Sequence, residues 1–309
     1  MSRLSNPRHL VAVLAAACLV LLLAAPSVAQ PDLATAPSTA ELSLAPADFP
    51  AGAKVSKQRY EKAVVPATST YSRAFRPGAR VGGTFLLMLE SEVSLYPTPA
   101  AAAQPVREFR RAVTGKANRS LFANALASGF AQESKVKLKR VALSQPASLG
   151  AGQSSVHISA TFVLANGRNV PMHMAFVQTD RALALLIAMP VGPRFPKADL
   201  RGLAKLQSDR LQKSFTVANV AVPTVTGTAA PAQTLTASTG DWSGAPSTYT
   251  YQWSRCDSTA TTCTDIPSAT SATYVVAAED TGSALRATVV AGNSVGSVGA
   301  TSAVTTPVA

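Results

Sequence analysis

The chain has 309 residues, of which 47% are hydrophobic and 14% are charged, and its formal net charge at pH 7 is +12. This length is enough for two domains of ordinary size. One apolar stretch, at the N-terminus, approaches membrane-spanning length, and no further Cys or His lies near Cys256 and Cys263. These observations argue against several membrane spans and against a zinc site at the cysteines.

The first 29 residues are predicted to be a secretory signal peptide. Arg3 and Arg8 lie in its basic region, an apolar run of about 16 residues follows, and Ala29 ends a small-x-small cleavage site before Gln30. The apolar run is shorter than the roughly 20 residues of a membrane span. We therefore expect a secreted or envelope-associated protein. The alternatives are an uncleaved N-terminal anchor and lipidation at Cys18.

Export also bears on the remaining cysteines. Only Cys256 and Cys263 lie beyond the signal, and two nearby cysteines in an exported chain predict one disulfide. Two free buried thiols are the alternative. The bond would close a short local loop, so we expect it to stabilise the fold by about 2 kcal/mol.

Residues 30–46 are rich in Ala, Pro, Ser and Thr, and this composition predicts a flexible spacer. A basic domain is expected from residue 47 onward, and a short helix over residues 56–62. Residues 81–96 then place apolar side chains on both faces of an extended segment. This pattern is typical of a buried strand, which Pro97 would end.

A helix is predicted over residues 100–130, with a break near Gly115. Pro105 suits the first turn of a helix better than its interior. Phe109 and Val113 recur at helical spacing and predict a buried face. The other side of the helix carries basic residues: Arg107, Arg110, Arg111, Lys116 and Arg119.

Four strands are predicted after this helix. In the first, basic and apolar side chains alternate: Lys135, Lys137 and Lys139 against Val136 and Leu138. In the second, over residues 154–164, the even positions are apolar, and the third repeats this alternation as far as Phe176. The fourth, over residues 182–189, is almost continuously apolar, as expected of a central strand.

The turn between the second and third of these strands decides which faces meet. A two-residue loop at Asn166 and Gly167 would place one apolar face over a polar one, because a slip of one residue flips every side chain. A three-residue loop from Ala165, with Gly167 at positive φ, pairs Leu164 with Arg168 and puts both apolar sets on one face. We therefore expect the three-residue loop.

A helix over residues 197–213 buries a leucine stripe and completes an antiparallel sheet with packed helices, an α+β domain over residues 47–215. The phrase ADFPAG at residues 47–52, the element order and VQTDRALALLI at residues 177–187 resemble the PsbP-like domains of actinobacterial envelope proteins, including LpqN-type lipoproteins. This resemblance implies an extracytoplasmic, sensor-like domain that is not an enzyme. It carries no residue signature.

Residues 216–309 are dominated by Thr, Ser, Ala, Val and Gly, and about seven short alternating runs predict an all-β sandwich. The segment around Trp253 and the motif Asp280-x-Gly282-x-x-Leu285 resemble a bacterial immunoglobulin-like repeat. Trp253 and Leu285 are therefore expected in the core of an immunoglobulin-like sandwich.

The sequence offers few candidates for catalysis or metal binding. His157 and His173, the only histidines beyond the signal, are predicted to be diagonal neighbours roughly 7–8 Å apart on the less apolar face of the sheet. A metal site would need a third ligand, and neither strand carries Asp or Glu, so we expect no metal and no cofactor. Glu90 and Glu92 could form a glycosidase-like pair, but the preferred interpretation is a solvated strand end. No G-x-S-x-G motif is present, and no catalytic residue is assigned.

Positive charge is the strongest functional indication. Residues 216–309 carry a net charge of −3, whereas residues 30–215 carry +13. The predicted anion-binding residues are Lys135, Lys137, Lys139, Arg140, Arg107, Arg110 and Arg111, and a second basic group comprises Lys197, Arg201 and Lys205. Outside the cell, such a surface can meet anionic lipid or cell-wall polymers. The alternative is that these charges provide solubility and protect an edge strand.

We therefore predict an exported, non-enzymatic envelope protein. Its basic α+β domain would bind an anionic lipid or wall polymer, with the immunoglobulin-like module as an accessory. One alternative is an adhesion or structural protein in which that module binds a protein partner, and another is an extracellular hydrolase. Nucleic acid is not expected as a partner, because the chain is exported and no aromatic stacking motif is interleaved with the charge.

Overall fold

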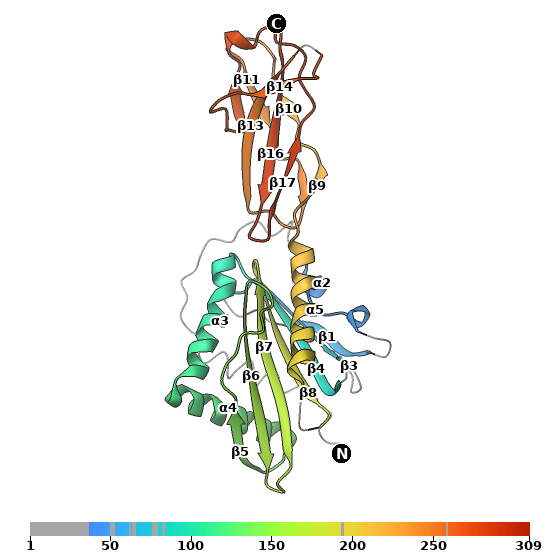
Figure 1. Cartoon of the computed structure of the whole chain (residues 1–309), viewed down its shortest axis with the longest axis vertical. Coiled ribbons are helices and arrows are strands. Elements are labelled where there is room, and N and C mark those ends of the chain that lie inside the picture. The colour runs from blue at the N-terminus through green and yellow to red at the C-terminus, as the bar shows by residue number, and fades with distance from the viewer. Residues whose placement is uncertain are drawn as a thin grey trace. The chain divides into compact units, whose positions relative to one another are not determined.

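The computed structural model describes residues 37–309, except for residues 50–52, 62, 64–65, 76–79, 82–83, 193–194 and 258. The predicted signal peptide and the start of the predicted spacer lie outside the described residues. The chain forms two compact units that join between Gln212 and Lys213 (Figure 1). We call residues 38–212 the first unit and residues 213–309 the second unit. In the described part of the chain, no helix is long and apolar enough to cross a membrane.

The first unit is built on one antiparallel sheet with the strand order β1-β2-β4-β8-β7-β6-β5, and a short β3 also pairs with β4. The strands are β1 (Val55–Glu61), β2 (Ser69–Phe75), β3 (Arg80–Val81), β4 (Thr84–Leu95), β5 (Leu138–Leu143), β6 (Ser154–Leu164), β7 (Asn169–Thr179) and β8 (Ala182–Pro190). Strands β5 to β8 form a meander that ends the sheet at β5. The mixed α+β content with a large antiparallel sheet is as predicted.

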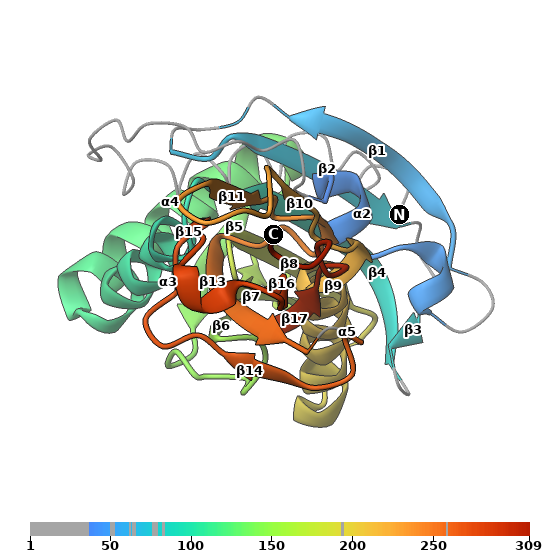
Figure 2. The ribbon, with the colours of Figure 1, turned by 90° about the horizontal axis from the view of Figure 1, so that it is seen from above.

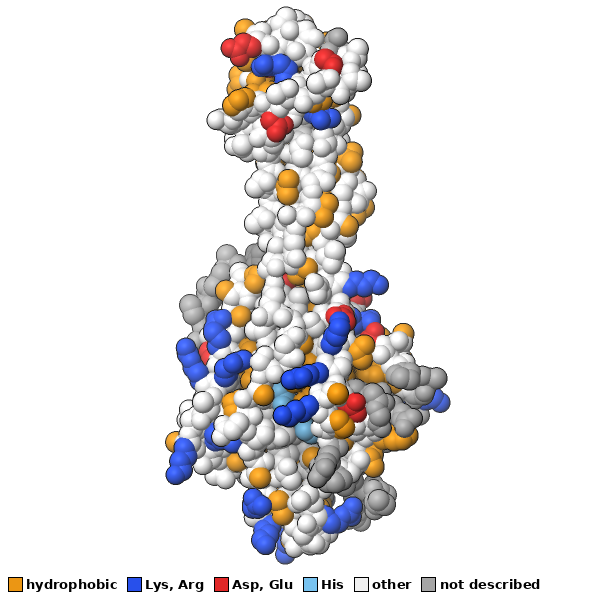
Figure 3. Space-filling model, in the orientation of Figure 1, with side chains coloured by type: hydrophobic (Ala, Val, Ile, Leu, Met, Phe, Trp, Pro, Cys, Tyr) orange, Lys and Arg blue, Asp and Glu red, His pale blue; other side chains and the backbone are white. Residues whose placement is uncertain are grey.

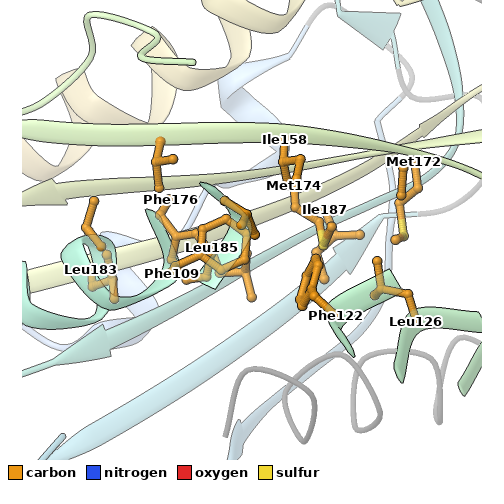
Figure 4. Packing of buried hydrophobic residues seen from close by; sticks show 14 of the residues in the cluster. Phe109, Phe122, Leu126, Ile158, Met172, Met174, Phe176, Leu183, Leu185 and Ile187 are labelled. Carbon is orange, nitrogen blue, oxygen red and sulfur yellow. The ribbon is translucent and has the colours of Figure 1, made fainter. Parts of the chain in front are cut away.

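Helices cover both faces of this sheet. They are α2 (Thr39–Leu42), α3 (Pro99–Thr114), α4 (Lys116–Ser134) and α5 (Lys197–Phe215). Helices α3 and α4 pack on one face, where Phe109 lies against Phe176 with ring centroids 4.6 Å apart and Phe122 lies under Ile187 (Figure 4). Helix α5 packs on the other face through Leu200 and Leu203. Figure 2 shows the strands of the sheet between the two sets of helices.

The predicted three-residue hairpin between β6 and β7 is confirmed. The Leu164 amide donates to the Arg168 carbonyl at 2.9 Å, and Gly167 has a φ of 81°. The register that follows pairs Ser159 with His173. All of Val156, Ile158, Ala160, Phe162, Met172, Met174 and Phe176 belong to the core under α3 and α4.

The predicted break at Gly115 separates α3 from α4. The prediction for Pro105 is wrong, because this proline lies inside α3. The helix begins earlier, at Pro99, and the Thr98 hydroxyl accepts the Ala101 amide at 3.2 Å. A capping threonine followed by proline is a helix-start signal that the sequence interpretation passed over.

The strict alternation predicted for residues 135–143 is interrupted by a β-bulge between Leu138 and Arg140. Leu138 before the bulge and Val141 after it both pack against the core under α4. Without the extra residue, one of the two would turn to solvent, because side chains alternate between faces. The bulge leaves the adjacent Lys139 and Arg140 both exposed.

Two predictions at the start of the first unit are wrong. Residues 56–62 do not begin a helix: β1 occupies Val55–Glu61 and pairs antiparallel with β2, a strand that the sequence interpretation missed. Three of the last four side chains of β1 are exposed and the fourth is half-buried, so no apolar alternation marked it. Its conformation depends on hydrogen bonding to β2, which overrides local preference.

The predicted flexible spacer is also wrong from Ser38 onward. Ser38 and Glu41 form a reciprocal capping box at the start of α2, a sequence signature that was present but not used. Leu42 and Leu44 are fully buried, and the Gln207 side chain donates to the Leu42 carbonyl at 2.8 Å. This segment is therefore part of the first unit.

After the last residues of α5, the described part of the second unit consists of short strands and one 3-10 turn. The strands are β9 (Ala218–Ala221), β10 (Val225–Thr226), β11 (Thr234–Ala237), β12 (Asp241–Ser243), β13 (Thr248–Cys256), β14 (Cys263–Asp265), β15 (Thr273–Val275), β16 (Ala284–Gly292) and β17 (Ser297–Thr301). They form a sheet β14-β13-β16-β17, a sheet β10-β11-β15 and the pair β12-β9. Leu235 from the three-stranded sheet shares one core with the fully buried Trp253 and Leu285 of the four-stranded sheet. The predicted disulfide joins Cys256 to Cys263.

Asp280 organises the bend before β16. Its side chain is fully buried and forms an ion pair with the Arg255 guanidinium at 2.6 Å. It also accepts the Tyr274 hydroxyl and the Ala277 amide, both at 2.8 Å. Gly282, two residues later, has a φ of 80°, which a residue with a side chain adopts only at a cost.

We expect Asp280→Asn to lower the free energy of unfolding by about 2 kcal/mol, because it removes the charge that pairs with Arg255 and places an amide NH2 group among donors, where it lacks an acceptor. Urea denaturation followed by tryptophan fluorescence measures this change. The matched control is Glu279→Gln, since Glu279 is largely exposed and lies 4.0 Å from the same guanidinium. Equal effects of the two variants would contradict a structural role for Asp280.

Candidate functional site

The predicted anion-binding residues lie in two groups within residues 99–143, which we call the basic layer: three lie on α3, and four lie from the end of α4 into β5. This stretch contains nine basic and two acidic residues, a formal charge of +7. All seven predicted residues are exposed: Lys135, Lys137, Lys139, Arg140, Arg107, Arg110 and Arg111. The basic side chains are distributed over the surface of the first unit, where acidic side chains are sparse (Figure 3).

Acidic partners are missing for these seven side chains within the described residues. Arg110 donates to the Ser155 carbonyl at 2.9 Å, and Arg107 reaches the Ala100 carbonyl at 3.5 Å. A carbonyl holds a guanidinium in place without neutralising it. Elsewhere in the first unit basic residues do have acidic partners, such as Arg210 with Asp48 at 2.9 Å. The basic layer therefore keeps an uncompensated charge.

Three of the seven residues also lie at the exposed edge of the sheet. Lys137 precedes β5, and Lys139 and Arg140 flank its bulge; β5 is the last strand in the order. Lysine and a bulge on an edge strand both discourage pairing with another chain. This structural role accounts for the strand residues, but it does not account for the three arginines of α3.

The second predicted basic group lies on α5, across the sheet from the basic layer. Lys197, Arg201 and Lys205 are exposed, and Lys205 forms an ion pair with Asp209 at 2.7 Å. Because α5 packs on the opposite face from α3 and α4, the structure does not join the two basic groups into one surface.

A hollow of about 360 Å³ opens within the basic layer, between α4 and β5. It is lined by Thr114, Lys116, Arg119, Ser120, Ala123, Val141, Leu143 and Gln145. None of these lining residues is acidic. The sequence predicts Lys116 and Arg119 on a basic helix face, but only the packing of α4 against β5 shows that they border a hollow.

The register confirms that His157 and His173 are diagonal neighbours on β6 and β7, because Ser159 lies opposite His173, and their side chains meet between the strands. Nε2 of His157 is 3.2 Å from Nδ1 of His173, and the ring centroids are 5.4 Å apart with the planes 10° from parallel. The distance between ring centroids is longer than the N–N distance by about the width of one imidazole ring. The two nitrogens therefore lie nearly on the line that joins the ring centres. Their lone-pair axes therefore point at each other, as in a hydrogen bond, and not at a shared metal ion.

The surroundings of this pair keep both rings neutral. Burial lowers the pKa of His157 to about 4, with a further contribution from His173, and burial lowers the pKa of His173 to about 4. The edge of the Phe195 ring packs on His173 at 5.1 Å between centroids. Among the described residues, no group of three His, Cys, Asp or Glu side chains could hold a metal ion.

The prediction that Glu90 and Glu92 lie at a solvated strand end is wrong. Glu90 is 6% exposed and accepts the Ser72 hydroxyl at 2.5 Å; burial raises its pKa. Burial, followed by the charge of Glu90, raises the pKa of Glu92 to about 7. Both residues face the side of the sheet that α3 and α4 cover, since Glu90 pairs with Ile187 and Glu92 with Leu185 of β8.

Tyr96 lies near both Glu92 and a third glutamate, Glu108. Burial, then the charges of Glu92 and Glu108, raises the pKa of the Tyr96 hydroxyl. Oε1 of Glu108 accepts the Gln104 amide at 2.7 Å, whereas Oε2 is buried and lacks a hydrogen-bond partner in the described part of the chain. With its pKa raised to about 7, Glu92 can hold a proton near neutral pH. The alternation of the sequence gave no sign that these glutamates would face inward.

Comparisons with known proteins assign no family. No family model matches the sequence, and no curated protein matches it. Among solved structures, the chain is similar to the extracellular domain of PknH from Mycobacterium tuberculosis, with a TM-score of 0.33 and 11% sequence identity over 57% of this chain and 93% of that chain. A similarity at this level supports neither a shared fold nor a shared function.

The histidine pair leads to a prediction about stability and pH. Its folded pKa values, about 4, lie below the ordinary value of about 6.5, so the unfolded chain binds more protons between these limits. The free energy of unfolding should therefore fall as pH drops from about 6.5 to 4, and the pair should account for about 2 kcal/mol or more of that loss. Glu90 and Glu92 act in the opposite direction, because their raised pKa values favour the folded state at low pH.

Urea denaturation of the parent and of the His157→Gln/His173→Gln variant at pH 7.5 and pH 4.5 isolates the contribution of the histidines, since the carboxyl groups are common to both proteins. The variant should lose less stability on acidification than the parent. Equal losses in the two proteins would show that the pair does not titrate as a buried neutral unit.

Proposed function

We propose that this protein is an exported, non-enzymatic envelope protein whose first unit binds anionic lipid or cell-wall polymer through the basic layer. The observation that supports this proposal is the set of seven exposed basic side chains without an acidic partner among the described residues. Like charges held close together repel one another, and a polyanion laid across them relieves that repulsion.

The competing explanation for the charge is solubility combined with edge protection. Edge protection explains Lys137, Lys139 and Arg140 at β5. It does not explain Arg107, Arg110 and Arg111, which lie on a helix that packs over the sheet. Three arginines on one face of α3, in addition to the charges at the sheet edge, favour a binding surface, because solubility alone does not require charge of one sign on one helix face.

For the second unit we propose an immunoglobulin-like sandwich that serves as an accessory module. Its three-stranded and four-stranded sheets share the core around Trp253, and residues 216–309 carry a net charge of −3, opposite in sign to that of residues 30–215. A module of this charge is poorly suited to a polyanion. For the first unit, the large antiparallel sheet with helices is in keeping with the resemblance to PsbP-like domains.

Co-sedimentation of the chain from Gln30 onward with anionic vesicles, and separately with cell-wall material, tests the proposal across a salt series. Each basic side chain near an anionic surface contributes about 1 kcal/mol, so Lys137→Glu/Lys139→Glu should weaken binding at least about tenfold. Binding should also weaken as salt rises, because ions screen exposed charges. The vesicle and wall arms distinguish lipid from polymer.

The matched control reverses two basic residues on α5, Lys197→Glu/Arg201→Glu, which changes the net charge equally on the opposite side of the sheet. Its binding should stay near the parent value. An equal loss in both variants would indicate non-specific attraction to a positive protein. Binding that neither variant changes would contradict a contact through Lys137 and Lys139, and absence of sedimentation in both arms would overturn the proposal.

A further inference from the structure

We propose that the hollow between α4 and β5 is a binding site for an anionic sugar, meaning a sugar or polyol ring that carries a phosphate or carboxylate. This inference rests on the proposed function and names the chemical unit that the basic layer would recognise. The hollow measures about 360 Å³, within the range of about 300–1,000 Å³ typical of small-molecule sites. That volume suits one monosaccharide-sized group better than a single ion.

Arg119 provides a fixed cation at this site. Its guanidinium donates to the carbonyls of Val113, Ser144 and Leu143, each at 2.9 Å. These three bonds join the end of α3 to the end of β5 and set the plane of the guanidinium before any ligand arrives. The carbonyls leave its positive charge uncompensated, and a planar guanidinium matches the geometry of phosphate and carboxylate.

Lys116 adds a second cation at the first residue of α4. Its side chain is exposed, and within the described residues it makes no ion pair. A lysine near a positioned arginine gives the hollow a mobile charge beside a fixed one. Because no acidic residue lines the hollow, a cationic ligand would meet an unfavourable potential there, and a neutral ligand would lack the charge–charge attraction that an anion gains.

The remaining lining groups suit the rest of a sugar. Thr114 and Ser120 donate their hydroxyl protons to the carbonyls of Arg110 and Lys116 within α3 and α4, which leaves oxygen lone pairs as acceptors for sugar hydroxyls. Gln145 contributes an exposed amide. The apolar wall consists of Ala123, Val141 and Leu143, a surface that the C–H face of a ring can cover.

Isothermal titration of the chain from Gln30 onward tests this site with four probes: glucose 6-phosphate, glucuronate, glucose and inorganic phosphate. The two anionic sugars should bind at least about fivefold more tightly than glucose or phosphate, because only they engage both the cations and the hydroxyl acceptors. Which anionic sugar binds more tightly identifies the charged group. Equal binding of phosphate and glucose 6-phosphate would reduce the site to a simple anion contact and overturn the proposal.

Two variants locate the binding. Lys116→Gln removes one lining charge and should weaken glucose 6-phosphate binding about fivefold or more, whereas Ala123→Leu fills the apolar wall without changing charge and should also weaken it. The control is Lys197→Gln on α5, which removes the same charge away from the hollow and should leave the affinity unchanged. Equal weakening by Lys116→Gln and Lys197→Gln would show that overall charge, not the hollow, attracts the sugar.

This experiment can fail separately from the test of the proposed function. Salt-sensitive sedimentation with no sugar binding would reject the hollow and keep the basic layer as a diffuse polyanion surface. Sugar binding that Lys116→Gln weakens, without sedimentation, would keep the hollow and reject the polymer or lipid surface.

Discussion

Burial of β8 on both faces is the constraint on which the first unit depends. Every residue from Ala182 to Pro190 is buried, and alternate side chains belong to two separate cores, with Ile187 in one and Leu186 in the other. A strand of this kind requires helices on both sides, because each apolar side chain left in water costs about 25 cal/mol per Å² of exposed apolar surface. The positions of α3, α4 and α5 follow from that requirement.

The same constraint explains where charge and polarity lie. Helices whose inner faces are occupied by the core must carry their polar residues outward, and α3 and α4 carry arginine and lysine there. The sheet cannot be covered at its edge by a helix of this layer, so β5 relies on charged residues and a bulge. The basic layer therefore combines the outer surface of α3 and α4 with the charged edge strand β5. The hollow lies between α4 and β5.

Local chemistry was sufficient to predict several elements. The β6–β7 hairpin was predictable because only a three-residue loop puts Val156 and Met172 on the same face, and the break between α3 and α4 followed from Gly115. Other features needed information that local patterns lack. The mostly exposed β1 has no periodicity of its own. The bulge at Lys139 lets Leu138 before it and Val141 after it face the same core, although regular alternation would put them on opposite faces.

The sequence by itself determined the apolar strand β8, the charge difference between the two parts of the chain, the hairpin register and the proximity of the two cysteines. These features depend on side-chain period, turn geometry and separation along the chain, which are local properties. Only the tertiary structure decided that His157 and His173 share a hydrogen bond, that Glu90 is buried, and that Lys116 and Arg119 border a hollow. Each of these features depends on which side chains from distant segments come into contact, and those contacts form only when the helices pack on the sheet.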